Sequence, residues 1–288
     1  MGLMGLFRKN LEIKYKRLRI ITILITIFTI WLIYTNYNYL VFKFLISYNY
    51  TDTTVLNEIY KEAIGEENFR SYFRNFDETV IAIYSNKLQE VGDDPYTFLY
   101  KPAEYDFARN YERDEARLAF IEEHEGNTVY IYIPNFSRHT NRFVQANVKK
   151  LEQYDNIIID LCGNLGGSLS SMYQIANLFL ERGDIIAKEE TRHTLTSRIV
   201  KAEKNAKLEY GNIYILVDDK TASAAEGLTM ALRENLDNVT VIGTQTFGKG
   251  VGQVTIPLKY GFATRATVLK MRTPSGGTIN RVGVVPDK

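Results

Sequence analysis

The stretch NIIIDLCGNLGGSLSSMYQIANLFLERG, residues 156–183, indicates the architecture of this chain. It begins with the near-continuous apolar run 156–161, which is typical of a strand buried on both faces of a parallel sheet. A glycine-rich turn follows. Residues 167–183 then have Leu169, Met172, Ala176 and Phe179 at helical spacing. A strand, a tight turn and a helix in this order predict one unit of an α/β layer.

The same alternation extends in both directions from this stretch. We predict strands at 128–134, 213–219 and 239–243, and helices at 143–154 and 224–235. After Lys249 the chain is rich in β-branched residues, which predicts strands within 254–260 and 262–277. The expected fold is therefore an α/β core with parallel strands, spanning residues 121–288.

Composition is that of an ordinary globular protein, with 45% hydrophobic and 24% charged residues. The formal net charge of +1 gives no general attraction to nucleic acid. Cys162 is the single cysteine, so no internal disulfide can form. The three histidines lie far apart and lack ligand spacing, and we expect neither a metal site nor a cofactor.

The N-terminal region has the pattern of a membrane anchor. Residues 1–19 carry six basic residues against the single acid Glu12, and residues 20–42 then contain no charge. A run of this length can cross a bilayer. A cleaved signal peptide is the alternative, but its apolar part would be shorter and end in small residues. We expect an uncleaved anchor at 20–42, with residues 1–19 in the cytoplasm and the rest extracytoplasmic.

Residues 43–120 are expected to form a helical cap. We predict two short helices within 51–78, and a turn followed by a helix within 93–117. Six aromatic residues lie within 16 positions: Tyr96, Phe98, Tyr100, Tyr105, Phe107 and Tyr111. These rings either pack the cap onto the core or line a peptide groove or docking surface.

Three turns should meet at one edge of the sheet. They contain DLCGNLGG at 160–167, DDKTASAAE at 218–226 and TFGKGVGQ at 246–253, and each follows a predicted strand. Ligands bind at this edge in parallel α/β sheets. The run Gly243-x-x-x-x-Gly248-Lys249 resembles a phosphate-binding loop. However, Gly250 replaces the required Ser or Thr, and strand rather than helix follows, so we disfavour nucleotide binding.

Ser223 has two interpretations. It is a favourable N-cap for the helix 224–235, or it is a nucleophile beside backbone amides that could stabilise an oxyanion. A nucleophilic serine needs a base. His193 lies in a polar stretch away from the strand ends, whereas Lys249 could act as base if burial lowers its pKa.

Five motifs in order resemble the C-terminal processing peptidases, or tail-specific proteases, of the Ser-Lys type. They are DLCGNLGG (160–167), SAAE (223–226), TFGKGVGQ (246–253), TPSG (273–276) and GVVPD (283–287), with a further counterpart in DPYTFLYKPAE (94–104). The resemblance implies a crotonase-like (ClpP/crotonase) core of repeated β-β-α units. It also implies serine endopeptidase activity on peptides, often near a C-terminus.

The resemblance assigns roles to individual residues. Ser223 corresponds to the nucleophile, Lys249 to the general base and Gln253 to the residue that orients the lysine. The amides of Ala224 and of Gly166 or Gly167 would form the oxyanion hole. The chain departs from the family pattern at Cys162, Leu165 and Ala225. It also has only 24 residues between Glu104 and Val129, too few for the PDZ domain of many members.

These observations together predict a membrane-anchored serine endopeptidase acting on extracytoplasmic proteins. Without a PDZ domain, a regulatory partner protein could take part in substrate selection. Two alternatives stay open: an inactive, anchored peptide-binding relative, and a crotonase-type acyl-CoA enzyme.

Overall fold

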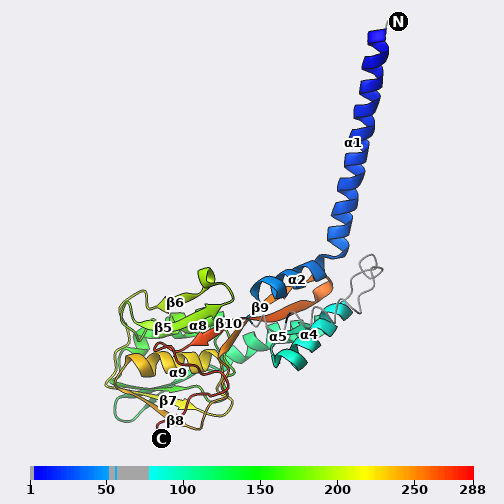
Figure 1. The fold of residues 1–288 in the computed structure, drawn as a ribbon. Coiled ribbons are helices and arrows are strands. Elements are labelled where there is room, and N and C mark those ends of the chain that lie inside the picture. Colours follow the sequence, from blue (N-terminus) through cyan, green and yellow to red (C-terminus); the bar gives the residue numbers. More distant parts are fainter. Residues whose placement is uncertain (1–2, 52–55, 57–77) are drawn as a thin grey trace.

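The computed structural model describes residues 3–51, 56 and 78–288 and divides into a core, a cap and a projecting N-terminal helix (Figure 1). The core contains a five-stranded sheet in the order β2-β3-β4-β7-β8. Its strands are β2 (Phe120–His124), β3 (Thr128–Tyr132), β4 (Asn156–Asp160), β7 (Asn212–Val217) and β8 (Val239–Gly243). The last four pair in parallel, as predicted, and β2 is antiparallel to β3.

Helices cover one face of this sheet. They are α6 (Arg138–Ala146), α7 (Val148–Leu151), α8 (Leu169–Ala176) and α9 (Ala224–Asn235). In Figure 1, α9 lies between strands β7 and β8 on one side and β5 on the other. One hydrophobic cluster joins these layers, with Ile157 and Ile159 of β4 packed among residues of α8, α9 and β5. The predicted helix 224–235 matches α9 residue for residue.

Our expectation that residues 156–161 are buried on both faces was wrong. In β4, Ile157 and Ile159 are buried, whereas Ile158 is half-buried. Strand β7 alternates in the same way. The reason is that helices cover only one face, while the other carries the rings of Tyr130 and Tyr132 beside Phe120.

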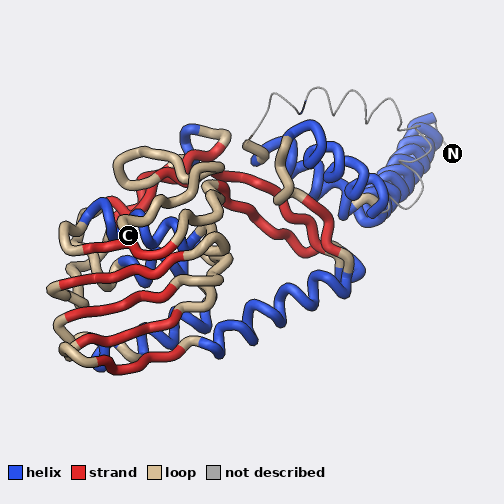
Figure 2. Tube along the Cα trace, turned by 90° about the horizontal axis from the view of Figure 1, so that it is seen from below, coloured by secondary structure: helices blue, strands red, loops and turns tan. Residues whose placement is uncertain are grey.

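A second sheet connects the core to the cap. It contains β1 (Phe98–Tyr100), β10 (Ala263–Arg272), β5 (Ile185–Thr191) and β6 (Arg198–Lys201) in that order, and β9 (Val251–Pro257) also pairs with β10. Strand β10 pairs with β1 at its start, with β5 at its end and with β9 along most of its length. One continuous strand therefore connects the cap to the core, and the long red strand segments that join these two parts are visible in Figure 2.

The cap has its own hydrophobic cluster. Helices α2 (Tyr37–Asn49) and α4 (Glu78–Gly92) contribute Phe42, Ile46, Ile81 and Leu88, which pack against Leu258 and Ala266. Helix α5 (Pro102–Glu115) lies in the helical part predicted within 93–117. Short 3-10 turns complete the elements at Ala116–Leu118, Thr194–Thr196 and Lys259–Gly261. The two helices predicted within 51–78 fall almost entirely outside the described residues.

Helix α1 (Leu3–Thr35) projects away from the rest of the molecule (Figure 1). Its segment Leu11–Thr35 is exposed and is long and apolar enough to cross a membrane, a property that signal sequences share. The apolar run 20–42 does not form one helix. It breaks at Asn36, and α2 continues from Tyr37 with Tyr39 and Phe42 buried in the cap.

Candidate active site

Hydrogen bonds join the three predicted turns at the sheet edge. The amide of Gly163 in the first turn donates to Asp218 of the second at 3.0 Å. The Thr221 hydroxyl donates to the carbonyl of Leu161 at 2.9 Å. The amide of Phe247 in the third turn donates to the carbonyl of Thr221 at 3.0 Å. The expectation that these turns meet is therefore confirmed.

Ser223 occupies a strained backbone position at the start of α9. Its φ is 57° and its ψ is −114°, a conformation that non-glycine residues rarely adopt. Gly166 packs directly against it, because a Cβ at Gly166 would lie 2.8 Å from the Cβ of Ser223. Such strain clusters at functional sites, where the surrounding structure maintains it. Ser223 is thus a candidate functional residue as well as the N-cap of α9.

The carboxylate of Glu226 links the serine turn to the lysine turn. Glu226 is fully buried. One oxygen, Oε2, accepts from the amides of Ser223 at 2.7 Å and Lys249 at 2.8 Å. The other, Oε1, accepts from the Thr246 hydroxyl at 2.6 Å and the Gly248 amide at 2.7 Å. Four donors thus satisfy a buried charge and set the spacing of the two turns.

Lys249 has the electrostatic environment of a potential base. Burial, followed by the positive charge of Arg265, lowers the pKa of its ammonium group to about 8. Its Nζ lies 4.4 Å from the centre of the Tyr96 ring. That ring favours the charged form and so opposes the effect of burial. Among the described residues, no hydrogen bond joins Lys249 Nζ to Ser223 or Gln253.

The two glycines of the first turn differ in the availability of their amides. The Gly166 amide donates to Oδ1 of the buried Asn164 at 2.8 Å. The Gly167 amide has no acceptor within the described part of the chain, and neither has the Ala224 amide beside Ser223. The amides of Gly167 and Ala224 could therefore donate to an oxyanion without breaking an existing hydrogen bond. The amide of Gly166 would first have to break its hydrogen bond to Asn164.

Gln253 contacts Arg265 rather than the lysine. Its Oε1 accepts from Arg265 at 3.2 Å. Its Nε2 donates to the carbonyl of Val251 at 3.3 Å and to the Thr267 hydroxyl at 3.4 Å. Gln253 lines the same cavity as Lys249.

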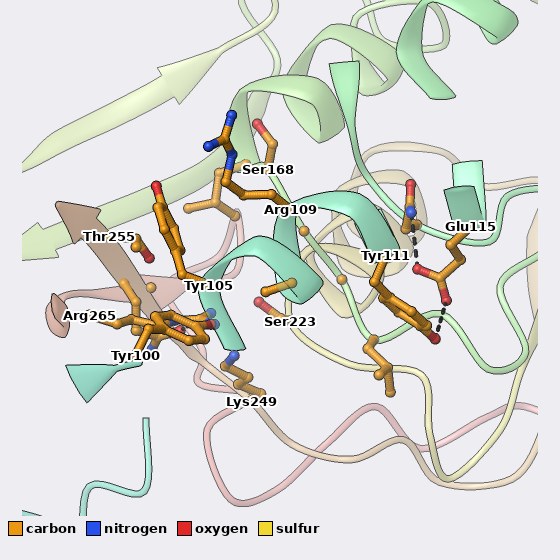
Figure 3. Close-up of a pocket in the computed structure, with 18 of the residues that line it drawn as sticks. Tyr100, Tyr105, Arg109, Tyr111, Glu115, Ser168, Ser223, Lys249, Thr255 and Arg265 are labelled. Atoms are coloured by element: carbon orange, nitrogen blue, oxygen red, sulfur yellow. Dashed lines mark hydrogen bonds between the residues drawn. The ribbon is translucent and has the colours of Figure 1, made fainter. Parts of the chain in front are cut away.

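Figure 3 shows the cavity that these residues share. It has a volume of about 730 Å³, and Ser223, Lys249 and Gly167 form part of its wall. Three residues of the aromatic cluster, Tyr100, Tyr105 and Tyr111, line it as well. Phe107 is instead exposed, and Tyr96 lies against the lysine. Residues of helix α5 thus form one side of this cavity.

Two other residues considered for catalysis, His193 and Cys162, do not line this cavity. His193 bonds through Nε2 to the carbonyl of Tyr48 at 2.8 Å and is not part of the cavity wall. Burial raises the pKa of the Cys162 thiol to about 12, so this cysteine is not a reactive thiolate. In the part of the chain that the structure describes, no group of three or more His, Cys, Asp or Glu residues is placed to hold a metal ion.

Sequence reasoning assigned no role to two carboxylates that shape this site, and it expected Tyr96 only to pack the cap onto the core or to line a groove or docking surface. Glu226 ends the SAAE motif, and Asp94 and Tyr96 begin DPYTFLYKPAE. Asp94 accepts from Thr97 at 2.6 Å and from Thr267 of β10 at 3.1 Å, which places Tyr96 beside Lys249. Both motifs were visible in the sequence, but the donors that surround these carboxylates were not.

Comparison with known proteins identifies similar sequences and folds. Residues 127–288 match the model described as Peptidase family S41. The carboxy-terminal processing protease CtpA of Bacillus subtilis is 34% identical over 169 residues, covering 58% of this chain and 36% of that protein. The carboxyl-terminal-processing protease of Synechocystis is 33% identical over 161 residues, covering 55% and 37%. The chain spans little more than a third of the length of these relatives.

Solved structures share the fold over more of the chain. The photosystem II D1 C-terminal processing protease aligns with a TM-score of 0.66 at 17% identity, covering 88% of this chain and 92% of that one. A lipoprotein from Streptococcus agalactiae aligns with the same TM-score at 18% identity, covering 88% and 90%.

Proposed function

Because this chain belongs to peptidase family S41, we propose that it is a serine endopeptidase with Ser223 as nucleophile and Lys249 as general base. The observation that carries the proposal is the buried carboxylate of Glu226. It bonds the backbone of both residues and so holds them in the wall of one cavity. A serine at a strained turn and a lysine with a pKa of about 8 are suited to these roles.

The proposed reaction has two stages. Ser223 Oγ attacks the scissile carbonyl carbon while Lys249 Nζ takes the hydroxyl proton. The amides of Gly167 and Ala224 donate to the oxyanion. The intermediate collapses to an acyl-enzyme, and Lys249 gives the proton to the leaving amine. A water molecule, deprotonated by Lys249, then attacks the ester carbonyl, and Lys249 returns the proton to Ser223 Oγ as the acid product leaves. Lys249 must first leave the Tyr96 ring and turn toward Ser223.

Gln253 could help to position the side chain of Lys249. A rotation of its side chain away from Arg265 would allow its Oε1 to accept from Lys249. We retain Gln253 as a positioning residue on that basis. Its present bond to Arg265 is 3.2 Å long, and both its Nε2 bonds exceed 3.2 Å, so the side chain is only loosely held.

We further propose a location and a substrate class. The basic residues before the exposed apolar helix would keep the N-terminus in the cytoplasm, and the cap and core would face the outside. Substrates would be extracytoplasmic proteins cut near their C-termini, by analogy with the processing proteases that the chain resembles. Protease added to intact cells would then degrade the cap and core and spare residues 1–19.

A second candidate is an inactive relative that binds peptides. The observation in its favour is that Lys249 contacts Tyr96 and not Ser223. One experiment separates the two functions. Full-length protein in detergent micelles is incubated with a peptide library, and new termini are identified by mass spectrometry. Cleavage that is absent with Ser223→Ala supports the peptidase. Equal cleavage by both proteins contradicts it, and binding without cleavage indicates the inactive relative.

A further inference from the structure

The candidate cavity has an excess of positive charge. Arg109, Lys249 and Arg265 line it, and Glu115 is the single carboxylate among the described residues of its wall. Glu115 already accepts from the Tyr111 hydroxyl at 3.1 Å and from Asn135 at 3.0 Å. The charges of Asp94 and Glu226 act on Lys249, but no carboxylate of the cavity wall forms an ion pair with Arg109 or Arg265 among the described residues, and the cavity suits an anionic ligand.

Arg265 is the more unusual of the two arginines. Its guanidinium donates to the Tyr100 hydroxyl at 3.1 Å and to Gln253 Oε1 at 3.2 Å, both uncharged acceptors. Its Nε is buried and has no hydrogen-bond partner in the described part of the chain. Within the described ranges, no carboxylate forms an ion pair with it. A partly buried charge without a counterion is unfavourable, so the position is explained best by an anion that arrives with a ligand.

The surroundings of Arg265 hold it in place. It lies on β10 between two paired strands, opposite Phe98 of β1 and Thr255 of β9. Its guanidinium carbon lies 5.9 Å from the centre of the Phe98 ring. Arg109, by contrast, is exposed on α5, with its guanidinium carbon 5.6 Å from the centre of the Tyr105 ring. Figure 3 shows Arg265 beside Tyr100, on the same side of the cavity as Lys249.

We propose that Arg265 binds a carboxylate of the peptide that occupies this cavity. The inference rests on the proposed function, because it takes the ligand to be a peptide. The planar guanidinium matches a carboxylate in a two-point arrangement. A cavity of about 730 Å³ is large enough for the end of a peptide chain. The carboxylate comes either from the C-terminus of the peptide or from an Asp or Glu side chain.

A carboxylate bound to Arg265 would change the pKa of Lys249. The charge of Arg265 helps to lower the pKa of the lysine. An anion on Arg265 would offset that charge and raise the lysine pKa again. The pH dependence of kcat for a peptide acid should therefore lie at higher pH than that for the matching amide.

The test measures binding with the full-length Ser223→Ala protein in detergent micelles, so that no cleavage interferes. Fluorescent peptides are compared as a C-terminal acid and its amide, and as matched Asp and Asn sequences, by fluorescence anisotropy. We expect the carboxylate form of one pair to bind about 10- to 100-fold more tightly. The pair that discriminates identifies the source of the carboxylate. Equal affinity within both pairs would overturn the proposal.

Variants of Arg265 provide the second arm. Each variant also carries Ser223→Ala. Arg265→Met should abolish the preference for the carboxylate peptide, and Arg265→Lys should reduce it. The amide peptide should bind to both variants as before. Arg142→Met changes the net charge equally on an exposed part of α6 and should leave the preference unchanged. A preference that survives Arg265→Met in folded protein would contradict the assignment. Because the test needs no turnover, its result is independent of whether Ser223 is a nucleophile.

Discussion

The carboxylate of Glu226 accepts a hydrogen bond from the backbone amide of Lys249 at 2.8 Å, across 23 positions of sequence. The same oxygen accepts from the amide of Ser223. The relative position of the proposed nucleophile and base thus depends on one buried side chain.

Glu226→Gln should damage both activity and stability. The amide retains one good acceptor and directs an NH2 group at backbone donors, which leaves buried amides unsatisfied. We expect a loss of about 2 to 4 kcal/mol in unfolding free energy and a decrease of at least about 100-fold in kcat/KM. Thermal unfolding measures the stability, and a peptide cleavage assay measures kcat/KM. Glu125→Gln, at an exposed position between β2 and β3, is the charge-matched control and should change stability by less than about 1 kcal/mol.

Ser223→Ala and Lys249→Ala should each reduce kcat by at least about 10⁴-fold, and the double variant should be little worse than either. The reason is that the two groups act in the same step. Single and double variants are compared with one peptide substrate. Effects that multiply in the double variant would show that the residues act independently.

The pH profile of kcat/KM should report the lysine. Protonated Lys249 cannot accept the serine proton, so activity rises about tenfold per pH unit on the acid side. It should level off above a pKa of about 8. Initial rates between pH 6 and 10 define the curve. A profile without a rise between pH 7 and 9 would exclude Lys249 as the base.

Replacing Lys249 should stabilise the protein at neutral pH. Its pKa falls from 10.5 to about 8 in the folded state, so the unfolded chain binds more protons between these values and unfolding free energy rises with pH across that window. Below pH 8 the folded state bears the full cost of the buried charge. Lys249→Met should therefore gain about 1 to 3 kcal/mol at pH 7, and the gain should shrink toward pH 10. Thermal melts at both pH values test this, and a loss of stability at pH 7 would contradict it.

The sequence was most informative where one local pattern determines the structure. The alternation of strand and helix patterns along the chain predicted both α9 at 224–235 and the parallel strands. The sequence was least informative where a contact joins residues that are far apart along the chain. The ring of Tyr96 reaches Lys249 over about 150 positions, and Arg265 faces the cavity because β10 bends from the core into the cap. Burial on both faces of 156–161 was predicted wrongly, because apolar composition does not reveal which face the helices cover.

Covalent labelling tests the central claim most directly. Full-length protein is treated with a fluorophosphonate at pH 9, digested and mapped by mass spectrometry, with Ser223→Ala and Lys249→Ala as controls. We expect one adduct on Ser223, absent in the Ser223→Ala protein and formed at least about 100-fold more slowly in Lys249→Ala. An unlabelled Ser223 in folded protein, or a labelling rate that does not depend on Lys249, would contradict the Ser-Lys account.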